Sequence, residues 1–300
     1  MRETDWIDRY IRPLVTAPGA AALADDVALL STPCPAIATM DTLVENVHFL
    51  ASDPLDTVGQ KLIRVNVSDI LAKGAKPAEL LLSIAWPRSR SEEAFSVLMQ
   101  GVARDLEAYD VALIGGDFVA TEGPLTLSAT LTGHCFSDAP IRRSGGAAGQ
   151  KICLHGDIGW GGLGLQAARN GGDPIATQRY RVPKIGTVGV AKIIAERASA
   201  SMDVSDGLLI DLARLADASG CGADLDLDCI PLAKASENID EIIAQCTYGD
   251  DYAMLVCAAP EREMPGFQAI GRLVQGGGLH LKYRSEAVKT PSTLGFEHTN

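Results

Sequence analysis

The spacing of apolar residues predicts how the first quarter of the chain is built. Residues 34–49 form a predicted strand whose apolar positions give way to a polar edge. A predicted helix covers residues 53–75, with Asp53 at its N-cap and Pro54 at its first helical position. Asp69 falls on the apolar stripe of this helix, where a charged side chain requires a partner. Asp69 is therefore a candidate functional residue.

The next segments predict a second helix and two strands of different character. Ser91 and the acids after it open a helix that extends to residue 106. Residues 111–114 form a short apolar run, typical of a buried strand, which ends at the Gly-Gly-Asp of 115–117. Residues 125–132 alternate apolar and polar side chains without a break, which predicts a half-buried antiparallel strand.

A glycine-rich and polar stretch at residues 138–150 marks a boundary between two halves of similar size. Beyond it, the pattern predicts strands at 151–154, 223–228 and 252–258 and helices at 163–170, 185–199 and 208–218. Residues 170–183 contain a turn followed by a loop. The expected organisation is an α+β fold of two domains, residues 1–140 and 141–300.

Composition narrows the possible functions. The 300 residues are 47% hydrophobic and 21% charged, which are values typical of a globular protein. The net charge of -12 argues against binding to nucleic acid or anionic membranes, because like charges repel. The acids comprise 24 aspartates and 14 glutamates, and aspartate is favoured in turns and metal sites. This balance suits a protein that meets polyanions through divalent cations.

Cysteine usage and hydropathy point to a reducing compartment. The seven cysteines are widely spaced and form no C-x-x-C pair, so neither a zinc site nor a disulfide framework is expected. No window approaches ~18 consecutive apolar residues, and the charged N-terminus leads into no apolar signal region. We therefore expect a cytoplasmic protein.

Two short motifs have competing explanations. Residues 159–164 (GWGGLG) match the G-x-G-x-x-G pattern of dinucleotide sites, but a turn and a loop follow where a parallel strand is required. A tight turn that packs on its neighbours is the favoured alternative. Residues 248–251 (YGDD) resemble the hairpin of nucleic-acid polymerases, yet the chain has no basic cluster for a template. No P-loop motif is present.

The positions of the aspartates are more informative. Nine of them lie at the ends of predicted elements, beside small or apolar residues: Asp25, Asp26, Asp41, Asp69, Asp117, Asp203, Asp206, Asp250 and Asp251. Each one alone is more typical of a cap or a turn former than of a functional residue. Together they form a repulsive cluster unless cations neutralise it, and Mg²⁺ prefers such oxygen ligands. Arg142 and Arg143 belong either to a phosphate grip or to a solvated linker. His48 taken alone is more typical of a structural histidine.

Seven segments together resemble thiamine-monophosphate kinases. Residues 39–49 (TMDTLVENVHF) are similar to the TDTLVEGVHF segment of that family, and residues 65–75 (VNVSDILAKGA) to its VNLSDLAAMGA. The later motifs follow in the family's order: GGD at 115–117, RSG at 143–145, MDVSDGL at 202–208, GDDY at 249–252 and GFEH at 295–298. The resemblance spans roughly residues 20–298.

The resemblance implies the activity, the fold and the site residues. It implies an ATP-dependent kinase that converts thiamine monophosphate to the diphosphate, on a two-domain α+β fold like that of aminoimidazole-ribonucleotide synthetase, and a homodimer. The implied Mg²⁺ ligands are Asp25, Thr39, Met40 through its backbone, Asp41, Asp69, Asp117, Asp203 and Asp206. The implied ATP contacts are Gly116, Asp117, Arg143 and Ser205, and the implied substrate contacts are His48, Asp250 and Phe296.

The implied chemistry agrees with the residues. Phosphoryl transfer depends on positioning and charge neutralisation, and the phosphate of thiamine monophosphate is already an anionic nucleophile. The chain departs from the family at Met40, which replaces a threonine, and at Asp250, which is one methylene shorter than the family's glutamate. Two alternatives stay open: another ATP-using enzyme on the same fold, or a Mg-nucleotide-binding regulator without turnover.

Overall fold

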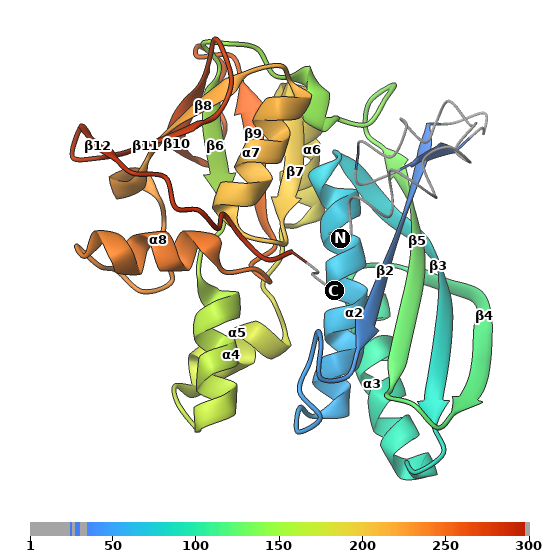
Figure 1. Cartoon of the computed structure of the whole chain (residues 1–300). Helices are drawn as coiled ribbons and strands as arrows, with labels where there is room; N and C mark the ends of the chain where they lie inside the picture. Colours follow the sequence, from blue (N-terminus) through green and yellow to red (C-terminus); the bar gives the residue numbers. More distant parts are fainter. Residues whose placement is uncertain (1–24, 26–27, 31–34, 298–300) are drawn as a thin grey trace, which may run out of the picture.

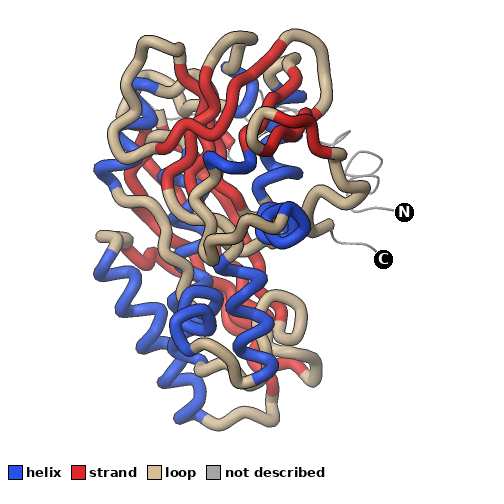
Figure 2. Tube along the Cα trace, turned by 90° about the vertical axis from the view of Figure 1, so that its left-hand side faces the viewer, coloured by secondary structure: helices blue, strands red, loops and turns tan. Residues whose placement is uncertain are grey.

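Two sheets built from successive parts of the chain form the framework of the molecule (Figure 1). The computed structural model describes residue 25, residues 28–30 and residues 35–297. In these ranges a five-stranded sheet uses residues up to 135, and a seven-stranded sheet starts at residue 151. A view turned by 90° shows the two blocks one above the other (Figure 2). The predicted α+β class with two flanked sheets is confirmed.

The first sheet has the strand order β1-β2-β5-β3-β4. Its strands are β1 (Ala28–Leu30), β2 (Ala36–Val44), β3 (Ala75–Pro87), β4 (Ala112–Thr121) and β5 (Thr126–Cys135). All neighbours pair antiparallel except β3 and β4, which are parallel because helix α3 (Glu92–Ala108) returns the chain between them. Helices α2 (Leu55–Ala72) and α3 lie on the same side of this sheet (Figure 1).

The two faces of the first sheet differ in burial. On β5, Leu127, Ala129 and Leu131 are buried in the core that includes α2. Ser128 and Thr130 alternate with them and point to the opposite side, which we call the outer face. The alternation of residues 125–132 therefore predicted this central strand correctly.

The second sheet has the strand order β12-β11-β8-β10-β6-β9-β7. Its strands are β6 (Lys151–His155), β7 (Ala200–Val204), β8 (Gly222–Asp226), β9 (Ala253–Ala258), β10 (Gln268–Val274), β11 (Leu279–Tyr283) and β12 (Glu286–Val288). The helices are α4 (Trp160–Asn170), α5 (Pro174–Arg181), α6 (Val188–Arg197), α7 (Leu208–Ala218) and α8 (Ile239–Thr247), with the 3₁₀ turns η4 (Arg143–Gly145) and η5 (Leu227–Cys229). Strand β6 pairs antiparallel with both neighbours, so the parallel unit of a dinucleotide fold is not formed there.

Helix α2 joins the two halves. The apolar core of the first sheet continues through this helix into α6 and β9 of the second half. Polar contacts accompany it, because Arg64 on α2 donates to the carbonyl of Pro183 at 2.8 Å and Ser68 donates to Asp203 at 2.5 Å. Among the described helices, none is both long and apolar enough to cross a membrane.

Three local predictions were wrong. Strand β4 is ten residues long, continues through Gly115–Asp117 and is exposed, because it is an edge strand without a further neighbour. Asp53 does not cap α2, since its carboxylate accepts from the backbone of Leu50 and pairs with Arg181. Residues 174–181 form helix α5 rather than a loop, with Asp173 as a cap that accepts from Ile175.

Candidate active site

A cavity of about 730 Å³ lies between the two halves of the chain. The first half contributes β2, the turn after it and α2, and the second half contributes the loops after β7 and before β9, the start of α4 and residues 293–296. The fold brings nine of the predicted residues to its walls: Met40, Asp41, His48, Asp69, Asp203, Ser205, Asp206, Asp250 and Phe296.

Four of these residues form what we call the aspartate cluster: Asp41, Asp69, Asp203 and Asp206. Burial, with repulsion from Asp206, raises the pKa of Asp41 to about 6. Burial also raises the pKa of Asp203 to about 6, and the charge of Asp41 contributes. For Asp69, burial and then repulsion from Asp203 and Asp41 raise the pKa well above its usual range. These shifts arise because the negative charges are close together and poorly hydrated.

Neutral hydroxyl groups hold two of these carboxylates. The Thr39 hydroxyl donates to Asp69 at 2.5 Å, and the Ser68 hydroxyl donates to Asp203 at 2.5 Å. Thr39 itself is buried and is not one of the residues that line the cavity. A hydroxyl orients a carboxylate but brings no positive charge, so the cluster still favours a bound cation.

The oxygen donors of the aspartate cluster fit Mg²⁺. Within the described ranges, no three acidic, histidine or cysteine side chains converge closely enough to hold a metal ion by themselves. Mg²⁺ usually retains waters and substrate phosphates and binds through one or two carboxylates rather than a protein cage. The donor set therefore suits ions that are shared with a phosphorylated ligand.

Helix α7 fixes the loop that carries Asp206. Arg214 donates to the carboxylate of Asp206 and, at 3.0 Å, to Asp211. Asp211 in turn accepts from the backbone nitrogen of Asp206 at 3.0 Å. Burial and the nearby charge of Asp206 raise the pKa of Asp211 to about 7. Arg214 and Asp211 therefore fix the orientation of Asp206 in the site.

Two further predicted residues lie beside the cluster. Asp25 forms a 2.8 Å ion pair with the fully buried Lys73, which also donates to the carbonyl of Ser201 on β7. Arg143 lies in η4, next to β7 and α7. Burial lowers the pKa of Arg143, while the charges of Asp25, Asp211 and Asp203 oppose that effect. The fold thus brings Asp25 and Arg143 to the aspartate cluster.

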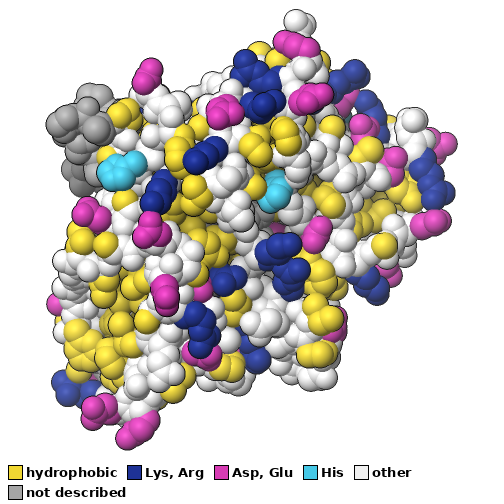
Figure 3. Space-filling model, turned by 180° about the vertical axis from the view of Figure 1, so that it is seen from behind, with side chains coloured by type: hydrophobic (Ala, Val, Ile, Leu, Met, Phe, Trp, Pro, Cys, Tyr) yellow, Lys and Arg dark blue, Asp and Glu magenta, His cyan; other side chains and the backbone are white. Residues whose placement is uncertain are grey.

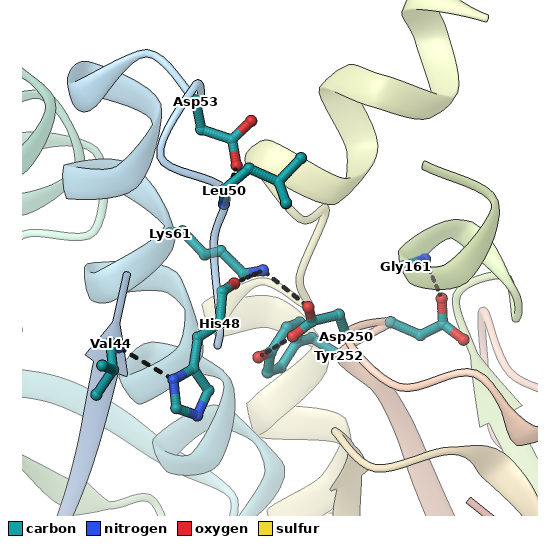
Figure 4. Close-up of polar contacts among 9 residues, drawn as sticks. Val44, His48, Leu50, Asp53, Lys61, Gly161, Asp250 and Tyr252 are labelled. Carbon is teal, nitrogen blue, oxygen red and sulfur yellow. Dashed lines mark hydrogen bonds and ion pairs between the residues drawn. The ribbon is translucent and has the colours of Figure 1, made fainter. Parts of the chain in front are cut away.

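Two of the predicted substrate residues, His48 and Asp250, belong to a second group with Lys61 and Tyr252, which we call the Lys61 cluster (Figure 4). Lys61 donates to the carbonyl of His48 at 3.0 Å and to Asp250 at 2.8 Å. Tyr252 donates to the other carboxylate oxygen of Asp250 at 2.9 Å. The backbone of Val44 donates to Nδ1 of His48, which leaves Nε2 as the protonated nitrogen of a neutral ring.

Close packing shapes the loop that carries Asp250. Asp250 has a φ of 67° and Tyr252 a φ of 55°, a left-handed conformation that costs energy for a bulky residue. A Cβ at Gly161 would lie 2.0 Å from the carbonyl oxygen of Gly249, and one at Gly162 would lie 2.1 Å from the Tyr248 ring. The glycine run at 159–164 therefore serves packing, as the favoured alternative predicted.

Gly116 and Asp117 lie elsewhere within one chain. Asp117 on β4 pairs with Ser83, which pairs with Ser128, which pairs with Thr42 on β2. Paired residues share a face, so Asp117 lies on the outer face, about 14 Å and three strand spacings from β2. One copy of the chain does not bring Asp117 to the aspartate cluster.

Comparison with known proteins matches both halves. The model of the AIR synthase related protein N-terminal domain matches residues 24–135, and that of the C-terminal domain matches residues 147–283. A thiamine-monophosphate kinase of Caulobacter vibrioides is 37% identical over 99% of this chain and 90% of its own length. This chain belongs to the thiamine-monophosphate kinase family of AIR synthase related proteins.

Solved structures extend the family match to three dimensions. The structure named AaThiL complexed with AMPPCP and TMP has a TM-score of 0.86 at 28% identity and covers 99% of this chain and 97% of its own. A HypE-HypF complex has a TM-score of 0.75 at 15% identity, covers 96% of this chain and 99% of its own, and shares the fold alone. The shared fold therefore does not decide between activities, whereas the kinase relatives do.

Sequence reasoning missed several residues of this family member's site, above all Lys61, Ser68, Asp211, Arg214 and Tyr252. A signal existed for Arg214, because it follows Asp211 by three positions on a helix and so lies on the same face. Lys61 also carried a weaker signal, because it lies beside Leu62 and Ile63 and three positions after Val58 on the predicted helix. The partners of Lys61 are far away in sequence, so only the fold identifies them.

Proposed function

We propose that this chain transfers the terminal phosphoryl group of ATP to thiamine monophosphate and so forms thiamine diphosphate. The observation that carries the proposal is a single cavity with two clusters, one suited to metal-bound phosphates and one to an organic substrate. The name of the AaThiL structure, which pairs the ATP analogue AMPPCP with TMP, supports the same pair of ligands. The activity would serve thiamine diphosphate biosynthesis, and we expect it in the cytoplasm.

The proposed metal and nucleotide contacts combine the resemblance with the observed positions. Bound Mg²⁺ would neutralise the phosphate charge and the charge that develops during transfer. The proposed ligands are Asp25, Thr39, the backbone of Met40, Asp41, Asp69, Asp117, Asp203 and Asp206. Gly116, Asp117, Arg143 and Ser205 would contact ATP, and the guanidinium of Arg143 is suited to phosphate oxygens.

The proposed substrate contacts are His48, Asp250 and Phe296. Phe296 is 49% exposed, and its backbone donates to the carbonyl of Asp206 at 2.8 Å. An exposed ring at the cavity offers a face for the flat pyrimidine of the substrate. Asp250 is already paired with Lys61, so it would act as a hydrogen-bond acceptor rather than as the counterion of the thiazolium.

The chain needs no strong general base for this reaction. The attacking group is a phosphate oxygen that is already anionic, and direct in-line transfer requires alignment of two phosphates. The residues of this chain would bind and orient both substrates and exclude water between the two halves. The charge of the aspartate cluster excludes the phosphates unless cations are bound, so turnover would require divalent metal.

We also infer that the chain acts as a homodimer through the outer face of the first sheet. Two apolar side chains on this face, Leu81 of β3 and Val119 of β4, are 45% and 48% exposed, and three more exposed apolar side chains lie along the same edge strand β4: Leu113, Ile114 and Phe118. Figure 3 shows hydrophobic side chains gathered on the first half, at the lower left. An exposed patch of this kind favours association. Asp117 would then reach a metal only across such an interface. A monomer mass by light scattering at micromolar concentration would reject this inference.

ADP release with thiamine monophosphate as acceptor tests the function. We expect release that depends on both Mg²⁺ and thiamine monophosphate, with thiamine diphosphate as the product. Release without that product would indicate another ATP-using enzyme, and nucleotide binding without release would indicate a regulator. Either result would overturn the proposal.

A further inference from the structure

Lys61 connects the two proposed substrate residues, although neither the sequence motifs nor the resemblance assigns it a role. It lies on α2 in the first half and is 1% exposed. One of its contacts is the carbonyl of His48 in the same half, and the other is the carboxylate of Asp250 in the second half. Lys61 therefore bridges the cavity at the residues that would recognise the substrate (Figure 4).

The Lys61 ammonium makes three contacts in the described structure. An ammonium has three N–H groups. Two of them serve the carbonyl of His48 and the carboxylate of Asp250, and the nitrogen also lies 4.3 Å from the centre of the Tyr180 ring. The ring face attracts a cation, so Tyr180 adds a third favourable contact. The side chain is therefore held in one position.

Asp250 is held from both sides. Lys61 binds Oδ2 at 2.8 Å, and Tyr252 binds Oδ1 at 2.9 Å. The backbone nitrogen of Asp250 donates to the carbonyl of Ser205 at 2.7 Å. The side chain is still 33% exposed, so its oxygens keep lone pairs directed toward solvent or a ligand.

Stability alone does not explain this ion pair. A buried ion pair replaced by apolar residues of similar volume is often no less stable, because desolvation offsets the attraction. This pair lines a substrate cavity and joins two halves of the chain. Positioning explains it better, because a ligand that contacts both halves requires their residues to be aligned.

We propose that Lys61 is a positioning residue for thiamine monophosphate, which orients the carboxylate of Asp250 and ties it to the His48 turn. The inference rests on the proposed function and deepens it. It assigns Asp250 the task of accepting a hydrogen bond from a neutral donor of the substrate, such as the aminopyrimidine, while Lys61 neutralises its charge.

The test compares Lys61→Met with Arg64→Met by kinetics and by titration calorimetry. Arg64 is a matched control, because it is a cation on the same helix that also bonds to the second half but not to Asp250. For Lys61→Met we expect the KM and the Kd for thiamine monophosphate to rise about tenfold or more, the cost of one charged hydrogen bond. The KM for ATP should stay within about twofold of the wild-type value. In Arg64→Met, the KM and the Kd for thiamine monophosphate should also stay within about twofold of the wild-type values.

A double-mutant cycle separates positioning from general damage. If Lys61 acts through Asp250, Lys61→Met should change the KM for thiamine monophosphate by less than about twofold in an Asp250→Asn background. Equal effects in both backgrounds, or an equal rise in the KM for ATP, would overturn the inference.

Tyr252→Phe provides a second route if Lys61→Met does not fold. It removes the other bond to Asp250 and leaves no buried charge, so the KM for thiamine monophosphate should rise about threefold or more. An unchanged KM would overturn the positioning of Asp250. Wild-type protein that neither binds nor phosphorylates thiamine monophosphate would refute the proposed function, whereas normal wild-type binding with unchanged Lys61→Met binding would refute only the inference.

Discussion

The aspartate cluster and the Lys61 cluster line the same cavity, but their carboxylates are compensated in different ways. Asp69 and Asp203 receive hydrogen bonds from the neutral hydroxyls of Thr39 and Ser68. Asp250 forms an ion pair with the ammonium of Lys61. The charge of Lys73 only partly offsets the burial and mutual repulsion of Asp69 and Asp203, whose pKa values stay raised, whereas Lys61 pairs directly with Asp250.

This difference separates two tasks that the amino acid types alone do not distinguish. All three residues are aspartates at the ends of predicted elements, and only the family resemblance assigns Asp250 to the substrate and the other two to the metal. Buried charges need partners, so the identity of the partner indicates the task. Asp69 and Asp203, which are held by neutral hydroxyls, are suited to a metal, whereas Asp250, which is paired with Lys61, is suited to hydrogen bonding.

The largest expected effect follows from removing a charge of the aspartate cluster. Asp69→Asn keeps the size of the side chain and its helix, so the fold should persist. Turnover should fall ~10²-fold or more, because a contact that stabilises developing charge is lost. Steady-state assays at saturating Mg²⁺, with a melting curve for each variant, provide the measurement.

Asp105→Asn is the matched control for Asp69→Asn. Asp105 is also buried in the first half, but it pairs with Arg64 outside the cavity. We expect a lower melting temperature and near-normal turnover. Near-normal turnover of folded Asp69→Asn would remove Asp69 from the metal site.

Metal binding should stabilise the wild-type protein through the aspartate cluster. Mg²⁺ at about 100 times its dissociation constant would add about 2.7 kcal/mol to the free energy of unfolding, since it binds the folded chain. Chelation should reverse the gain, and Asp69→Asn should show little of it. Denaturant titrations with and without Mg²⁺ measure this, and equal gains in both proteins would contradict the assignment.

On the substrate side, Phe296→Ala should affect one substrate only. Loss of the ring should raise the KM for thiamine monophosphate about tenfold, as a contact made equally in the ground and transition states is lost. The KM for ATP should change little. If both constants rise together, or only that for ATP, residues 293–296 serve folding or the nucleotide instead.

A further prediction concerns the pH dependence of stability at Asp251, which accepts from the backbone of Gly159 and Gly161. Burial raises the pKa of Asp251 to about 7. The folded chain therefore retains a proton that the unfolded chain loses between about pH 4 and pH 7, so this group makes the free energy of unfolding fall as pH rises.

Asp251→Asn should remove this part of the pH dependence. The difference in the free energy of unfolding between the wild type and the variant should fall by at most ~1.4 kcal/mol per pH unit between about pH 4 and pH 7. Urea titrations at pH 5, 6 and 7 measure the difference, and a constant difference would contradict the prediction. Asp110→Asn is a control, because Lys76 lowers the pKa of that exposed carboxyl.

Much of the fold was predictable because its signals are local. Helix α7 was predicted with its observed ends, 208–218, since an apolar stripe and a following glycine define both. The exposed strand β4 was not predictable as such, because an apolar run does not reveal whether another layer of the fold packs on its side chains. Asp53 failed as a cap for a similar reason, since Arg181 competes for it from 128 residues away.

The sequence by itself determined which aspartates stand at the ends of elements, and its motifs indicated phosphate chemistry. Both properties depend on neighbours along the chain. Only the tertiary structure decided that Lys61 compensates Asp250 across 189 positions, that Ser68 holds Asp203 across 135, and that Asp117 lies on the outer face of the sheet. Ion pairs and sheet faces depend on distances between elements, and these are set when α2 packs between the two halves.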